Sequence, residues 1–373
     1  MDFPTEGSGC RMKTRLLLLK MVLAICCLFV LSGCWDNRDI NHRSLPIVMG
    51  ISREDSQYKL FLVLPKSGQD GTKSMLVTRT GQTITEIVDE ISSNMESRVD
   101  LLHLKVIVFE RKYAEEGLAD SVSSFIRSRE ISAKALVAIC DEDIGKFFDH
   151  LHKETETDQT VLYNFFEKNA GLNPTVAVSR IWEIFRSIHS YTRDIGIPLI
   201  RSGTSTIIEN AGTAIIQHGR MVGQISADET MLFNAFNERS AHGRIEVMNH
   251  ASVIILDNSM KHHVTLKNGA PYIRSQIHLK VSILETRGNP SLDTIKDELE
   301  SQLTERFRRM IKSMQQHEAD ILGVGQYFRN KIPREQLAHW RSEYFPRLRM
   351  DLVVKTTIQN EGNLKTDNIN TRQ

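Results

Sequence analysis

The sequence predicts a multidomain α+β protein, in which mixed or antiparallel sheets are covered by helices. Two patterns predict this class. In the first half of the chain, short apolar strands alternate with amphipathic helices, as they do in a sheet layer covered by helices. After residue 250, strands follow one another in hairpins and one long helix comes next, which predicts a helix packed on an antiparallel sheet. The length of 373 residues allows two or three domains.

The first 33 residues predict a secretory signal peptide. Basic residues precede an uninterrupted apolar run at residues 21–31, which is too short to span a bilayer comfortably. The run leads into Leu-Ser-Gly-Cys at residues 31–34, which resembles a bacterial lipobox, and the resemblance implies that Cys34 is acylated and begins the mature chain. An uncut signal anchor is the alternative. Residues 1–11 suit a signal peptide poorly, so Met12 is a second candidate for the start.

Charge and cysteine content exclude two classes of protein. Removal of the first 33 residues takes away four of the 47 Lys and Arg and two of the 46 Asp and Glu, which leaves a formal charge of −1 and no basic surplus for nucleic acid. Besides Cys34, only Cys140 stays in the mature chain, so no intrachain disulfide can form. Cys140 ends an apolar run, and we interpret it as a buried small hydrophobe rather than a nucleophile.

The N-terminal elements begin with strands at residues 47–51 and 58–64, and Pro65 is expected to end the second. A helix is predicted from Thr83, because Glu86 completes a capping box with it. The apolar stripe of this helix is Ile84, Ile87, Val88, Ile91 and Met95.

A strand at 104–109, a helix at 113–127 and a strand at 134–140 come next, followed by helices at 142–151 and 161–169. A further helix is predicted with Asn173 as its cap and Pro174 at its first position. Its expected apolar face is Val178, Ile181, Trp182, Phe185 and Ile188.

Residues 191–198 change the pattern from long helical periods to short strands rich in Gly and Thr, which predicts a domain boundary. Strands are expected at 204–208, 211–217 and 221–225, with a tight turn at 218–220. Ser226 and Glu229 form a second capping box, which predicts a helix through about residue 236.

The C-terminal elements are strands at 244–248, 251–256, 262–266 and 272–285, the last two joined by a turn at Asn268-Gly269. Pro290 and Ser291 begin the longest helix, which is expected to lie across the sheet. Its apolar positions are Leu292, Ile295, Leu299, Leu303, Phe307, Met310, Ile311 and Met314. A helical stretch to about residue 327, a break at Pro333, a helix at 336–343 and a strand at 348–358 complete the chain.

These elements divide the chain into a leader (residues 1–33), an N-terminal α/β-type domain (34–190), a small middle domain (191–250) and a C-terminal α+β domain (251–373).

No catalytic, metal-binding or cofactor-binding motif is found in the sequence. Gly323-Val324-Gly325 begins like a dinucleotide loop but does not follow a strand. His262 and His263 are expected on opposite faces of a strand, where they cannot share a metal ion. Three acidic residues at 141–143 are explained by the helix dipole, with a catalytic carboxylate as the alternative. Residues 193–198 are interpreted as a bend between domains.

The lipobox-like sequence is followed at once by Trp-Asp-Asn-Arg-Asp-Ile at residues 35–40, and together they resemble the Ger(x)C family, the lipoprotein component of spore germinant receptors. Residues 102–108, 212–214, 222–224, 229–230 and 321–325 resemble that family in the same order. Two stretches, 52–55 and 215–218, depart from the family pattern. The resemblance covers nearly the whole chain.

The resemblance implies a non-enzymatic, three-domain extracytoplasmic protein without a cofactor. Acylated Cys34 would hold it in the lipid of the spore inner membrane, on the outer face, where it joins integral-membrane subunits of the receptor. The residues directly after the lipid would lie at headgroup level, where they can contact a partner or serve only as a spacer. They are Trp35, Asp36, Arg38 and Asp39. The alternative function is an anchored solute-binding lipoprotein, which would need two similar lobes around a cleft.

Overall fold

The computed structural model describes residues 19–22, 43–68, 71–154, 160–172 and 174–360. It divides into two units, residues 1–43 and 44–373. In the first unit, residues 19–22 form one helical turn. Within the described ranges, no helix combines the length and the apolar character that a membrane span requires.

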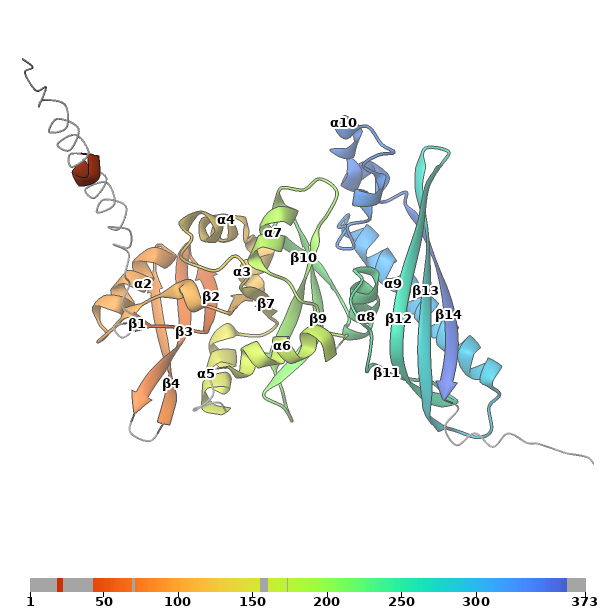
Figure 1. Ribbon diagram of the computed structural model, residues 1–373, viewed down its shortest axis with the longest axis horizontal. Helices are drawn as coiled ribbons and strands as arrows, with labels where there is room; N and C mark the ends of the chain where they lie inside the picture. Colours follow the sequence, from red (N-terminus) through yellow and green to blue (C-terminus); the bar gives the residue numbers. More distant parts are fainter. Residues whose placement is uncertain (1–18, 23–42, 69–70, 155–159, 173, 361–373) are drawn as a thin grey trace, which may run out of the picture. The chain divides into compact units, whose positions relative to one another are not determined.

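The larger unit contains an eight-stranded sheet with the order β10-β9-β8-β7-β6-β2-β3-β4 (Figure 1). Its strands are β2 (Val48–Glu54), β3 (Gln57–Gly68), β4 (Gly71–Gly81), β6 (Val106–Glu110), β7 (Leu136–Cys140), β8 (Ile195–Ser202), β9 (Ile208–Gln217) and β10 (Arg220–Ile225). The four central strands are parallel, and an antiparallel pair lies on each side of them. The carboxyl ends of the four parallel strands therefore lie at one edge of the sheet.

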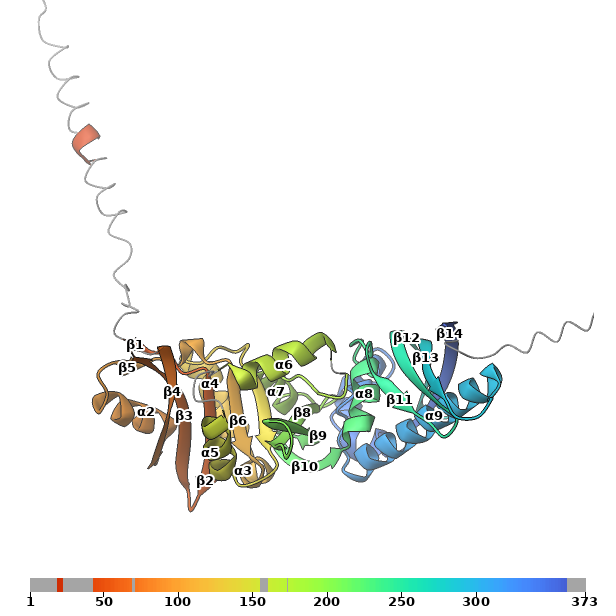
Figure 2. The ribbon, with the colours of Figure 1, turned by 90° about the horizontal axis from the view of Figure 1, so that it is seen from below.

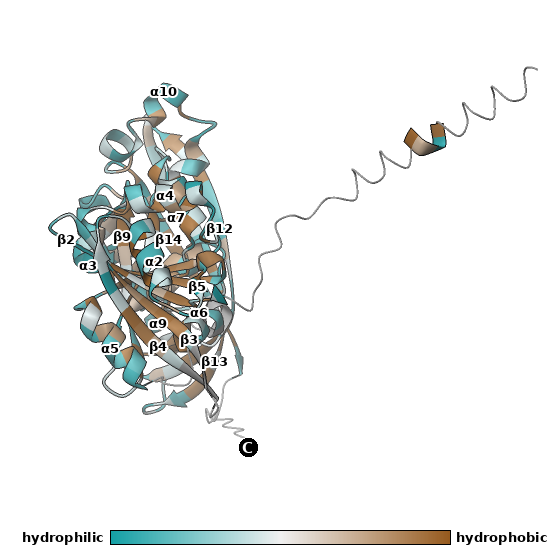
Figure 3. Ribbon diagram, turned by 90° about the vertical axis from the view of Figure 1, so that its left-hand side faces the viewer, coloured by the Kyte–Doolittle hydropathy of each residue, from teal (hydrophilic) through white to brown (hydrophobic). Residues whose placement is uncertain are grey.

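Helices cover both faces of this sheet and bury a separate core on each. One core contains apolar side chains of α2 (Ile84–Ser93), α3 (Arg111–Glu116), α4 (Ala119–Ser128) and α7 (Ile181–Ile188). The other contains side chains of α5 (Ile144–Glu154) and α6 (Val161–Leu172). Strands such as β3 are correspondingly hydrophobic in Figure 3. Central strands covered on both faces need apolar residues at successive positions, as in Val-Ile-Val-Phe of β6.

Local signals were confirmed where capping chemistry is explicit. The Thr83 side chain accepts the Glu86 N–H at 3.1 Å and caps α2. Ser226 and Glu229 cap α8 (Ala227–Phe236) in the same way. The turn at Asn268-Gly269, in which both residues have positive φ, forms an antiparallel hairpin as predicted. The strands expected separately at 251–256 and 262–266 are instead one continuous strand.

The prediction that Pro65 ends its strand was wrong, and β4 was missed. Pro65 pairs with Ser74 of β4 inside β3, whereas β2 pairs with β3 only as far as Val63. Proline lacks an N–H, and it is tolerated here because this stretch of β3 pairs on one side only. The predicted helix at 113–127 is also divided, because Gly117 ends α3 before α4 begins.

The predicted helix start at Asn173 and Pro174 was wrong. Asn173 lies outside the described residues, and α7 begins only at Ile181. Before it, the Ser179 carbonyl accepts the Val137 N–H at 2.9 Å, and the Asn234 side chain donates to the carbonyls of Pro174 and Val176. These bonds hold the segment before α7 in an extended form, so Val178 is not on the helix. Trp182 is on the helix but is 39% exposed rather than part of its buried face.

The bend predicted at 193–198 was wrong for its last four residues, which belong to β8. This strand pairs with β7 in parallel through Ile139–Leu199 and with β9 in antiparallel. Bends occur instead at residues 204–207, where a strand was expected. The sheet thus continues across residue 190, and the division into three domains stays a prediction.

A second, four-stranded sheet has the order β11-β12-β13-β14. Its strands are β11 (Ile245–Val247), β12 (Ala251–Lys267), β13 (Ala270–Thr286) and β14 (Arg349–Asn360). Helix α9 (Leu292–Gln316) runs along it in Figure 2 and buries Leu299, Leu303 and Met310 against it, as predicted. The sheet is mixed, because β14 is parallel to β13. The helix returns the chain to the end of the sheet where β13 begins, so the next strand runs in the direction of β13.

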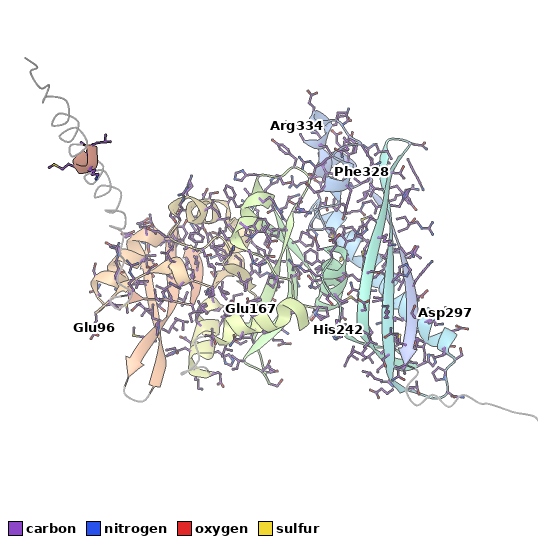
Figure 4. The ribbon with its side chains drawn as sticks, in the orientation of Figure 1. Glu96, Glu167, His242, Asp297, Phe328 and Arg334 are labelled. Atoms are coloured by element: carbon purple, nitrogen blue, oxygen red, sulfur yellow. The ribbon has the colours of Figure 1, made fainter. Side chains whose placement is uncertain are left out.

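The residues between α9 and β14 fold into short turns rather than the predicted longer helices. They include the 3-10 helix η3 (Val324–Phe328), α10 (Arg334–Leu337) and the π-helical turn η4 (Trp340–Tyr344). Figure 4 labels Phe328 and Arg334 in this segment. Its buried Phe328 and Trp340 rings stack with centroids 5.4 Å apart.

Candidate functional site

A buried carboxylate, Asp320, organises the turn that follows α9. Gly323 adopts a left-handed conformation with φ of 66°, which aims the next two N–H groups back at Asp320. The Val324 N–H donates to Oδ1 at 2.9 Å and the Gly325 N–H donates to Oδ2 at 2.8 Å. The Trp340 indole N–H donates to Oδ2 at 3.0 Å. The glycine-containing turn therefore binds an anion, but the anion is a carboxylate of the chain itself.

A second buried carboxylate, Asp194, lies at the start of β8 and pairs with Arg341. The Arg341 Nε donates to both oxygens of Asp194 at 3.1 and 3.0 Å, and Nη2 donates to Oδ1 at 2.8 Å. The same Nη2 donates to the Ser190 carbonyl at 2.7 Å. Arg341 is only 8% exposed and Asp194 only 2%, so the ion pair is shielded from water.

Asp194 and Asp320 are hydrogen-bonded to each other through their backbones and the Asp194 side chain. The Asp194 N–H donates to the Asp320 carbonyl at 2.8 Å, and the Asp320 N–H donates to Asp194 Oδ2 at 2.8 Å. We call Asp194, Asp320, Trp340 and Arg341 the junction cluster, because it ties the start of β8 in the large sheet to the segment that precedes β14.

The pKa of Asp320 is raised to about 7, first by burial and also by the negative charge of Asp194, while the N–H bonds from Gly325, Val324 and Trp340 oppose the shift. The cluster has the character of a structural tie. Every carboxylate oxygen in it already accepts a hydrogen bond, so none is available to a substrate.

A second candidate is the cleft at the carboxyl ends of β6 and β7, with a volume of about 300 Å³. It is lined by Glu110, Arg111, Lys112, Glu115, Asp141, Glu142 and Asp143. Ligands often bind at this edge of a parallel sheet.

The carboxylates of this cleft are nevertheless engaged. Arg111 forms ion pairs with Asp141 and with Glu115. The Asp143 carboxylate accepts the Lys146 N–H at 2.8 Å, and Glu142 accepts the Ser202 N–H at 2.6 Å. Within the described ranges, no group of three His, Cys, Asp or Glu side chains is placed to hold a metal ion.

Two further predictions about single residues were confirmed. Cys140 is a buried free cysteine, and burial raises the pKa of its thiol to about 12. His262 packs between the rings of Phe236 and Tyr327, at centroid distances of 4.3 and 5.4 Å, while its neighbour His263 is exposed.

Two family models match almost the whole folded part of the chain. Residues 36–202 match the spore germination protein N-terminal domain, and residues 211–362 match the spore germination B3/GerAC-like C-terminal domain. The chain belongs to the Ger(x)C family.

Two spore germination proteins match this chain over most of their length. Spore germination protein KC of Bacillus subtilis (strain 168) is 23% identical over 92% of this chain and 96% of that protein. Spore germination protein GerQC of Bacillus cereus is 20% identical over 78% of this chain and 84% of that protein. The crystal structure of the GerBC protein matches with a TM-score of 0.57 at 16% identity, over 84% of this chain and 97% of that one. It shows that the fold is shared.

Two of the stretches that resembled the Ger(x)C family form buried contacts in the structure. Residues 321–325 follow Asp320 and form its binding turn. The Thr213 hydroxyl in β9 hydrogen-bonds the Thr230 hydroxyl in α8 at 2.8 Å, and both are fully buried. Residues 102–108 span the end of the 3-10 helix η2 (Leu101–His103) and the start of β6.

The predicted site residues Cys34, Trp35, Asp36, Arg38 and Asp39 lie outside the described residues. The junction cluster was missed, because its partners are separated by up to 147 residues in the sequence. One signal was present. Asp320 stands between Ala319 and Ile321-Leu322, and an acidic residue inside an apolar run predicts a buried carboxylate with fixed donors.

Proposed function

We propose that this chain is a lipid-anchored subunit of a spore germinant receptor. Acylated Cys34 would hold it on the outer face of the spore inner membrane, where it supports the germination response to nutrients by assembling with integral-membrane subunits. The observation that carries the proposal is the lipobox-like sequence at residues 31–34, placed directly before the family match that starts at residue 36.

The distance between anchor and fold supports this function. The larger unit begins at Ser44, so residues 35–43 are the only connection to Cys34. Nine residues extend no further than about 30 Å. Acyl chains contribute about 0.8 kcal/mol per buried methylene, and two or more make the anchorage firm. The folded part would therefore stay close to the headgroups and to extracytoplasmic loops of a partner.

The described polar sites support assembly rather than turnover. The carboxylates of the junction cluster and of the cleft are bound to donors within the chain. The only thiol among the described residues is buried with a raised pKa, which removes a thiolate nucleophile. We propose Trp35, Asp36, Arg38 and Asp39 as contacts to a membrane subunit, because Trp favours the bilayer interface and the charges can meet juxtamembrane loops.

The test is metabolic labelling with a radioactive fatty acid. Cys34→Ala should abolish the label and leave the leader uncleaved, whereas the matched control Cys140→Ala should be labelled and processed like the wild type. Label on the Cys34→Ala protein at mature size would refute the anchor.

In the same membranes, replacing Trp35, Asp36, Arg38 and Asp39 with Ser and Gly should release the membrane subunits at normal acylation. Retention of the subunits would make these four residues a spacer.

A further inference from the structure

Aromatic and arginine side chains, all exposed except the half-buried Arg193, gather next to the junction cluster. They come from two segments, α7 with the turn after it and the segment around η3. We call them the basic-aromatic surface: Trp182, Arg186, Tyr191, Arg193, Tyr327 and Arg329. The exposed fraction is 39% for Trp182, 61% for Tyr191 and 41% for Tyr327, which is high for large aromatic residues.

Direct contacts make the two segments one surface. The Arg186 guanidinium lies over the Trp182 ring, 4.8 Å from its centroid. Arg193 crosses to the second segment, where its Nε lies 2.4 Å from the place that a Cβ on Gly323 would occupy. A Cβ at residue 323 would require the Arg193 guanidinium to move from this position. The Gln326 amide also donates to the Thr192 hydroxyl, so η3 is held against the turn after α7.

The positive charge of this surface is not neutralised within the described part of the chain. Arg186, Arg193 and Arg329 form no ion pair with an Asp or Glu there. Partial burial lowers the pKa of Arg186, and the charge of Arg193 lowers it further, while the charge of Glu183 raises it. An incoming anion would offset the repulsion between the two guanidinium groups.

The nearby carboxylates are occupied or displaced from these guanidinium groups. Glu183, one turn before Arg186, accepts the Arg180 N–H at 2.9 Å in the capping box of α7. The carboxylate of Asp194, next to Arg193 in the sequence, is paired with Arg341. The pKa of Tyr327 is raised first by burial and second by the negative charge of Glu238, so the Glu238 carboxylate lies near the Tyr327 phenol.

We propose that the basic-aromatic surface docks an acidic segment of a partner protein, an extracytoplasmic loop or tail that carries several Asp or Glu side chains. The proposal deepens the proposed function, because it names the chemistry of the partner that a receptor subunit would recruit. Arginine binds carboxylates through two parallel hydrogen bonds, and Trp, Tyr and Arg are the residues that dominate binding energy in protein interfaces.

The surface fits an acidic protein better than an anionic lipid headgroup. Surfaces that recruit anionic lipids carry clusters of about four to eight Lys and Arg side chains, often on an amphipathic helix. The basic-aromatic surface has three arginines and no lysine. Arg186 is stacked on Trp182, and both segments are fixed from below by the junction cluster. A rigid, preformed set of arginine and aromatic groups favours a shaped partner over a fluid one.

The test is site-specific photo-crosslinking in spore membranes with the full chain. Tyr191, the most exposed of these aromatic residues, is replaced by p-benzoylphenylalanine, and the crosslinked residue is mapped by mass spectrometry. The probe chain also carries Arg186→Glu, or the matched control Arg274→Glu on the exposed face of β13. Thermal unfolding of both variants checks that they fold, and Arg186→Gln replaces Arg186→Glu if the reversal disturbs folding.

The expected crosslink falls in a segment of a membrane subunit with net negative charge. Arg186→Glu should lower its yield about tenfold, as expected for loss of one hot-spot residue, and Arg274→Glu should leave it unchanged. A crosslink to lipid, a crosslink to a segment without acidic residues, no crosslink, or a yield that Arg186→Glu does not change would overturn the proposal. If the chain is still acylated and still copurifies with the membrane subunits, such a result refutes this surface and leaves the proposed function standing.

Discussion

At the scale of single residues, the junction cluster holds two buried carboxylates and the groups that bind them. A buried ion pair adds little net stability compared with apolar residues, but removal of one partner leaves the other charged and dry. Among the described residues, the Asp194 carboxylate accepts hydrogen bonds from Arg341 and from the Asp320 N–H. Arg341 is its only cationic partner there. The pair is therefore expected to tolerate loss of either member poorly.

Arg341→Met should lower the free energy of unfolding by about 3–5 kcal/mol, because it leaves the Asp194 carboxylate buried without its cation. The control is Arg308→Met, which breaks the exposed pair with Glu305 and should cost at most about 1 kcal/mol. Urea unfolding measures both. Equal effects of the two substitutions would mean that the cluster does not stabilise the fold.

Asp320 also predicts a dependence of stability on pH. Burial raises its folded-state pKa from 3.8 to about 7, so the folded chain keeps a proton that the unfolded chain releases from about pH 4 upward. The contribution of this carboxyl to the free energy of unfolding therefore falls as the pH rises through that window.

The comparison that isolates this carboxyl is Asp320→Asn, which cannot titrate. Between pH 4 and 7 the wild type should lose stability relative to Asp320→Asn, measured by urea unfolding at each pH. Parallel curves for the two proteins would show that the carboxyl does not titrate in this range.

At the scale of elements, the sequence predicted best those features whose chemistry is local. The capping boxes at Thr83 and Ser226, the Asn268-Gly269 turn and the apolar period of α9 depend on residues within one or two turns of each other. The start of α7 could not be predicted, because Arg180 and Ser179 pair with the distant β7. The position of Pro65 inside a strand could not be predicted, because β3 accommodates a proline there only since β2 ends before it. The junction cluster could not be predicted for the same reason, because no local sequence pattern joins Asp194 to Arg341.

Helix α9 offers a test of the element that the period predicted most clearly. Leu303→Ala should lower the free energy of unfolding by about 2–5 kcal/mol, because Leu303 is fully buried against the four-stranded sheet. Lys312→Ala, at an exposed position of the same helix, should change it by less than about 0.5 kcal/mol. Similar unfolding midpoints for the two variants would contradict the packing of α9 as the cover of that sheet.

At the scale of the whole molecule, the larger unit is continuous across residue 190. Residue 190 lies between β7 and β8, which are neighbours in one sheet, and the junction cluster adds bonds from the start of β8 to the segment before β14.

The measurement that tests the central claim most directly is copurification from spore membranes in mild detergent. The mature chain is isolated through an epitope tag at its C-terminus, and the membrane subunits that accompany it are quantified in the wild type and in Cys34→Ala. We expect a fixed ratio of chain to membrane subunits in the wild type, and loss of both this complex and the nutrient response in Cys34→Ala. A wild-type chain that elutes without membrane subunits, together with a normal nutrient response of the Cys34→Ala spores, would contradict the account.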